Sequence, residues 1–105
     1  MEEIYVIVHE WFVDRAVDMG KEFAADVKNE LNWIKTNKKF VSISVNEKPA
    51  IIHPELPPPS SNLLLKVCGA FTHKEYMCVD IQCLALRIEG YNAQIYSPAT
   101  LESKV

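Results

Sequence analysis

Apolar residues gather in four short runs along the chain, and the pattern within each run predicts a β-strand. Ile4–Val8 is a nearly continuous apolar run, which indicates a central strand covered on both faces. Phe40–Val45 alternates apolar residues with serine, the pattern of a half-buried strand. Asn62–Cys68 is rich in leucine and reads as a buried strand, and Ala93–Ser97 alternates again. The chain is therefore expected to contain four strands.

The first predicted helix lies between the first two strands. Asp14 is a suitable N-cap, and the helical pattern continues to about Thr36. Gly20 weakens it, because glycine costs about 1 kcal/mol in a helix interior. The regular helix is thus expected to begin as late as Lys21, with a loop or a strand extension as the alternative before it. Residues at helical spacing form its core stripe: Phe23, Val27, Leu31 and Ile34.

The second predicted helix has a signal at each end. Thr72 and Glu75 have the spacing of a capping box, in which each side chain accepts from the backbone amide of the other. The helix is expected to run to about Glu89. Gly90 ends it, because glycine adopts the left-handed conformation that helix C-termini favour.

Between the second and third strands the chain loses its periodicity. The segment from Asn46 to Ser61 contains Pro54 and the run Pro57–Pro59, which favour an extended conformation without regular structure. It is interpreted as a stiff connector within one domain, with a polyproline ligand as the alternative function. The residues from Thr100 to the end are expected to form a frayed tail.

The element order β-α-β-β-α-β predicts a single α+β domain over residues 1–105 with a ferredoxin-like fold. In that fold a four-stranded antiparallel sheet, in spatial order 4-1-3-2, carries both helices on one face. A three-layer parallel arrangement is the alternative. The sequence argues against it because two helices are few to cover both faces of a parallel sheet.

Composition narrows the class of protein. A hydrophobic content of 49% and a charged content of 24% are ordinary for a soluble globular domain, and no apolar run is long enough to cross a membrane. The net charge of −3 argues against nucleic-acid binding, which depends on neutralising phosphates. The acidic start lacks the basic region of a secretory signal, so a cytoplasmic location is expected. Three irregularly spaced cysteines predict free thiols.

Candidate catalytic residues fall into two groups at opposite ends of the predicted antiparallel sheet. His9 and Glu10, with His53, have the side chains of an acid-base or metal site, although their spacing matches no metal motif and no metal site is predicted. Cys68 precedes a helix N-terminus and has His73 nearby, the arrangement of an activated thiol. Each group also has a plain structural explanation: solvated histidines in one case and a packed thiol in the other.

The N-terminus of the second helix is also a candidate anion site. Its backbone amides would hold the anion, and the basic residues expected close by are Lys38, Lys39 and Lys74. The Glu75 carboxylate competes for that position, and the turn before the helix lacks the spacing of a phosphate-binding loop.

Surplus apolar positions provide the strongest functional signal. The second helix has one apolar stripe expected to face the sheet, formed by Met77, Ile81, Leu84, Ala85 and Ile88. A second stripe, expected to face outward, contains Tyr76, Val79, Cys83 and Leu86. The face of the sheet expected to be open adds further apolar positions, of which Tyr5 and Tyr96 are the aromatic ones. A small monomer should not leave both surfaces exposed, so a homodimer is expected.

These observations predict a small non-enzymatic binding protein that self-associates and recognises a partner protein or small ligand. The expected binding residues are Tyr76, Val79, Leu86, Tyr5 and Tyr96. No cofactor motif is present in the sequence. The alternative is a small enzyme that uses Cys68 with His73, or His9 with Glu10.

Overall fold

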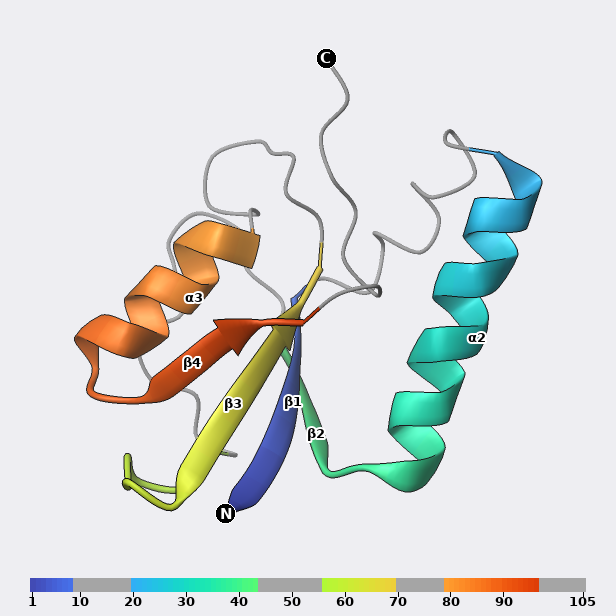
Figure 1. Ribbon diagram of the computed structural model, residues 1–105. Coiled ribbons are helices and arrows are strands. Elements are labelled where there is room, and N and C mark those ends of the chain that lie inside the picture. The colour runs from blue at the N-terminus through green and yellow to red at the C-terminus, as the bar shows by residue number, and fades with distance from the viewer. Residues whose placement is uncertain (9–19, 44–55, 70–78, 97–105) are drawn as a thin grey trace.

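The computed structural model describes residues 1–8, 20–43, 56–69 and 79–96, and these form two helices and four strands (Figure 1). The elements in chain order are β1 (Glu2–Val8), α2 (Lys21–Asn37), β2 (Phe40–Ile43), β3 (Leu63–Cys68), α3 (Val79–Ile88) and β4 (Asn92–Ile95). Each lies within or next to a segment that the sequence pattern predicts. The predicted capping box at Thr72 and Glu75 lies outside the described residues.

The four strands form one parallel sheet in the order β2-β1-β3-β4. β1 lies in the middle, pairing with β2 on one side and β3 on the other, and Ile4–Val8 is buried throughout. The prediction of a central strand covered on both faces is therefore confirmed. A strand that is apolar at successive positions needs cover on both sides, and a parallel sheet with helices on both faces provides it.

The two helices lie on opposite faces of the sheet, so the molecule has three layers (Figure 1). On the α2 face, Val27, Leu31 and Ile34 pack with Tyr5 and Ile7 of β1. On the other face, residues of α3 pack against alternate residues of all four strands in a larger core. That core consists of Ile4, Val6, Val8, Val41, Ile43, Leu56, Leu63, Leu65, Val67, Val79, Cys83, Leu86 and Ala93.

The predicted ferredoxin-like sandwich with an antiparallel sheet and both helices on one face is therefore wrong. Two helices are enough to cover both faces of this parallel sheet. Here each helix covers part of a different face, and Leu56, from the long connector, is buried in the α3-side core as additional cover. Because β3 runs parallel to β1, the connector between β2 and β3 is a crossover that returns the chain to the end of the sheet where β1 begins.

The helix ends follow local chemistry. α2 begins directly after Gly20, whose φ is 121°, as the sequence argument allowed. Gly90 lies in the turn that closes α3 and has a φ of 101°. Two backbone bonds close this turn: Gly90 N donates to Arg87 O and Tyr91 N donates to Leu86 O. This pair of bonds is the Schellman motif, so the predicted glycine stop is confirmed.

A parallel sheet also changes which residues share an end of the molecule. β1 and β3 end side by side, with Ile7 paired to Cys68, so the separation of the β1 end from Cys68 in the sequence argument is wrong. Lys39 lies at the opposite edge, where its Nζ is 2.6 Å from Glu2 Oε2. The expected placement of Lys38 and Lys39 beside the candidate anion site is therefore wrong, whereas Lys74 and the predicted start of that helix lie outside the described residues.

Candidate functional site

The carboxyl ends of β1 and β3 lie at a topological switch point of the sheet. β1 connects through α2 to β2 on one side, and β3 connects through α3 to β4 on the other, so the chain diverges between these two strands. Doubly wound sheets bind ligands outside the strand ends at such a switch point. In the described residues this position is tightly packed: a Cβ on Gly69 would lie 3.0 Å from Val8 O. Gly69 is needed there because the backbone of β1 approaches it closely.

Cys68 is the last residue of β3, at this end of the sheet, and its surroundings oppose the role of an activated thiol. The residue has 0% exposure, and its Sγ donates to Val6 O at 3.6 Å. Burial is the main cause that raises the pKa of the Cys68 thiol to about 12, and the charge of Glu30 adds to it. A nucleophilic cysteine needs a lowered pKa and access to substrate. Cys68 thus has the properties of a core residue.

The α2 face of the sheet brings together Tyr5 and Tyr96, the two aromatic residues singled out in the sequence. Their ring centroids are 5.0 Å apart and the rings meet edge to face. Lys66, which pairs with Tyr5 across the sheet, places its Nζ 5.5 Å from the Tyr5 ring centroid and 5.8 Å from that of Tyr96. Lys66 Nζ also lies 3.3 Å from Glu3 Oε1. This part of the face is a cation–aromatic cluster and is not an open apolar surface, because α2 leaves Tyr5 only 3% exposed.

Tyr96 connects this cluster to α2. Its hydroxyl donates to Glu30 Oε1 at 2.5 Å, a short hydrogen bond to a charged acceptor. Burial, followed by this hydrogen bond, raises the pKa of the Tyr96 hydroxyl above its ordinary value. The tyrosine therefore keeps its proton at neutral pH, and the bond holds the Glu30 carboxylate at the flank of α2.

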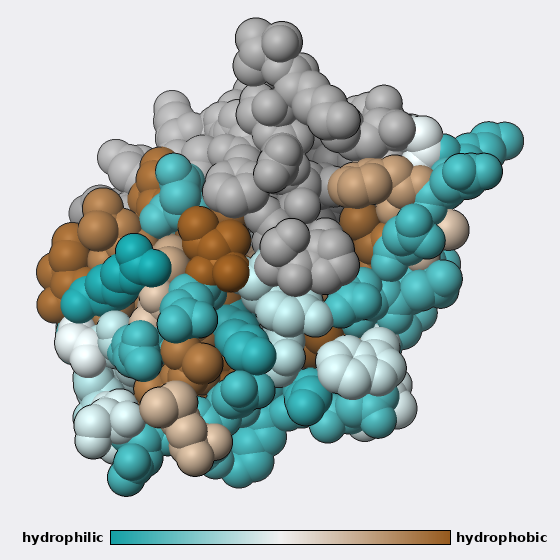
Figure 2. Space-filling model, in the orientation of Figure 1, coloured by the Kyte–Doolittle hydropathy of each residue, from teal (hydrophilic) through white to brown (hydrophobic). Residues whose placement is uncertain are grey.

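The two apolar stripes of α3 are oriented opposite to the sequence prediction. Val79 and Leu86, expected to face outward, are 0% and 1% exposed and belong to the core. Leu84 and Ile88, expected to face the sheet, are 55% and 75% exposed. Both stripes are apolar, and only the position of the sheet decides which one is buried. Figure 2 shows hydrophobic side chains gathered at the left, over α3, whereas the outer side of α2 at the right is largely hydrophilic.

The sequence analysis did not predict the contacts of Glu30 and Lys66 with the tyrosines of the α2 face. It also did not predict that Leu84 and Ile88 are exposed. Glu30 and Tyr96 are 66 positions apart, so no local pattern connects them. The contacts of Lys66 could have been expected, since a lysine inside an apolar strand must place its ammonium group near a partner or in solvent. The remaining site candidates lie outside the described residues: His9, Glu10, His53, His73 and Tyr76.

The described residues contain no group of three or more His, Cys, Asp or Glu side chains placed to hold a metal ion. Within the same ranges, neither helix combines the length and apolar character needed to cross a bilayer.

Comparison with known proteins finds no match for this chain: no protein-family model, no curated protein and no solved structure shows significant similarity to it.

Proposed function

We propose that this chain is a non-enzymatic binding protein that self-associates through the outward stripe of α3, formed by Ile81, Leu84 and Ile88. The supporting observation is the exposure of two large aliphatic side chains one helical turn apart, 55% for Leu84 and 75% for Ile88. The half-buried Ile81 lies one turn before Leu84 on the same side. Exposed apolar residues are ordinary when scattered singly, but a continuous stripe is typical of an interface.

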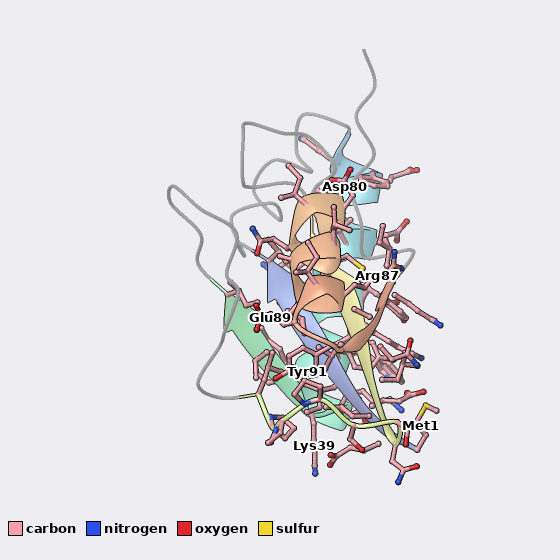
Figure 3. All side chains as sticks on the ribbon, turned by 90° about the vertical axis from the view of Figure 1, so that its left-hand side faces the viewer. Met1, Lys39, Asp80, Arg87, Glu89 and Tyr91 are labelled. Atoms are coloured by element: carbon pink, nitrogen blue, oxygen red, sulfur yellow. The ribbon has the colours of Figure 1, made fainter. Side chains whose placement is uncertain are left out.

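The occupant that fits this stripe best is a second copy of the chain. When two copies of α3 pack antiparallel about a two-fold axis, the same flank of each helix faces its counterpart in reverse order. Asp80 near the start of α3 then lies across from Arg87 of the other copy, and the pairing occurs twice. Figure 3, which views the molecule from the α3 side, shows Asp80 toward the upper end of the helix and Arg87 lower down. Opposed helix dipoles favour the same arrangement.

Pairing through helices is favoured over pairing through the edge strand β4. Arg87 Nε donates to Ala93 O at 2.8 Å, so a side chain already occupies a backbone acceptor of that strand. Covering an edge in this way opposes strand addition. A stable interface buries about 800 Å² on each partner, more than three side chains supply, so a weak, concentration-dependent pair is expected.

Sedimentation equilibrium over a wide concentration range tests the proposal. The wild-type chain should shift toward twice its monomer mass as concentration rises, whereas Leu84→Glu and Ile88→Glu should remain monomeric. Both variants should stay folded by circular dichroism, because the side chains they replace are exposed. Gln94→Glu adds the same charge at an exposed position on β4 and serves as the control. Asp80→Asn should weaken pairing at low salt. A wild type that stays monomeric at every concentration contradicts the proposal.

A small enzyme built on Cys68 is the second candidate, and the burial of this thiol disfavours it. Labelling with a thiol reagent at neutral pH separates the two functions. A packed Cys68 should react only as fast as the protein unfolds, while an activated thiol should react within seconds in the folded state. The buried free thiols Cys68 and Cys83 fit a reducing compartment, and we include a cytoplasmic location in the proposal.

A further inference from the structure

α2 lies on the opposite side of the sheet from α3 (Figure 1). A hollow of about 490 Å³ lies along one flank of α2. Its described lining residues recur at helical spacing and therefore form one stripe. They are Phe23, Asp26, Val27, Asn29, Glu30 and Trp33. Its volume is within the range of small-molecule sites, about 300–1,000 Å³.

The side chains in this hollow share a preference for cations. Phe23 and Trp33 provide aromatic rings whose faces attract positive charge, and Asp26 and Glu30 provide carboxylates. Val27, which is 2% exposed, adds an apolar floor. Neither lysine nor arginine is found among the described lining residues. The combination of rings, carboxylates and apolar surface suits an ammonium group on a hydrocarbon stem.

Two contacts within the chain bear on how this flank meets a cation. Lys38 Nζ lies 5.4 Å from the Trp33 ring centroid, so the ring suits an ammonium group, and an incoming amine must displace Lys38 from it. Glu30 is held in place by the Tyr96 hydroxyl, which uses one of the several acceptor positions of the carboxylate. The carboxylate is thus positioned before a ligand arrives, which lowers the entropic cost of binding.

The spacing of the two carboxylates determines the length of a matching ligand. Asp26 and Glu30 are one turn apart, and a helical rise of about 1.5 Å per residue separates them by about 6 Å along the axis, close to the span of a four-carbon diamine. We propose that the flank of α2 binds a short alkyl diamine, with its ammonium groups at Asp26 and Glu30 and its stem against Val27, Phe23 and Trp33. This site goes beyond the proposed pairing, because it lies on the other face of the sheet.

Titration calorimetry with the full chain and putrescine, the four-carbon diamine, tests the site directly. Putrescine should bind up to about fivefold more tightly than butylamine, since an exposed charge pair contributes up to about 1 kcal/mol. Asp26→Asn should remove this preference, and Trp33→Leu should weaken the binding of both amines. The Trp33 indole N–H resonance should move during a putrescine titration followed by NMR.

Two controls localise the result. Glu89→Gln removes a carboxylate from the end of α3 and should leave putrescine binding unchanged. Glu30→Gln keeps an oxygen acceptor for Tyr96, so it should fold and yet lose the preference for the diamine. Leu84→Glu, which prevents the proposed pairing, should bind putrescine like the wild type, so failure of one proposal is distinguishable from failure of the other. Absence of binding, or equal affinity for putrescine in wild type and Asp26→Asn, overturns the inference.

Discussion

The two faces of the sheet are built from the same four strands but differ in chemistry. The α3 side is closed by a core of aliphatic, alanine and cysteine side chains, and its helix also presents aliphatic residues outward. The α2 side has a smaller apolar core, at whose margin lie Tyr96, Lys66 and Glu30 with the contacts of a charged network. An outward apolar stripe favours a protein partner, and a flank of rings and carboxylates favours a cation. The molecule thus presents two surfaces suited to different ligands.

The largest effect should separate the inner and outer stripes of α3. Leu86→Ala removes a side chain that is 1% exposed and should cost about 2–5 kcal/mol of unfolding free energy. Leu84→Ala, at 55% exposure, should change it by no more than about 0.5 kcal/mol. Urea denaturation at low protein concentration measures both. Equal losses at the two positions would mean that the orientation of α3 differs from the one described.

A smaller effect should distinguish the two tyrosine hydroxyl bonds. Tyr96→Phe removes a bond to the Glu30 carboxylate and should cost about 1.5–3 kcal/mol at neutral pH. Tyr91→Phe, the matched control on the α3 side, removes a bond to the neutral Pro57 carbonyl and should cost about 0.5–1.5 kcal/mol. A larger cost for Tyr91→Phe would contradict the view that the α2 side carries the stronger polar contacts.

The stabilisation by the Tyr96 hydroxyl should depend on pH in the alkaline range. Burial raises the pKa of Tyr96 in the folded state above its usual value near 10.0, so the folded state binds the hydroxyl proton more tightly than the unfolded state does. The contribution of Tyr96 is therefore complete below pH 10 and is lost as pH rises further toward the folded-state pKa. The difference in unfolding free energy between wild type and Tyr96→Phe should shrink above pH 10. A difference that grows with pH would reverse this assignment.

The smallest effect concerns Lys66. Lys66→Met keeps the hydrocarbon stem over Tyr5 and Tyr96 but removes the charge that lies near Glu3. Both charged side chains are partly exposed, so the loss should be under about 1 kcal/mol and should decrease further in high salt. Chemical denaturation at two salt concentrations measures it. A loss above about 2 kcal/mol would show that the cation–aromatic contacts stabilise this face strongly.

The sequence by itself determined where most elements lie, because the signals for them are local. The stripe of Val27, Leu31 and Ile34 predicts the buried side of α2, and all three residues are buried. Gly90 predicts the end of α3 because the left-handed conformation there has little cost for glycine. The continuous apolar run of β1 predicts a strand covered on both faces, which also holds.

Tertiary structure alone decided the strand directions, the orientation of α3 and the composition of the candidate sites. A strand pattern is the same for parallel and antiparallel neighbours, so the proline-rich connector was compatible with either direction of β3. The two stripes of α3 are chemically alike, and the stripe of Leu86 is buried because the sheet lies on its side. The contact between Tyr96 and Glu30 joins residues far apart in the chain, and it exists only once β4 and α2 are placed on the same sheet.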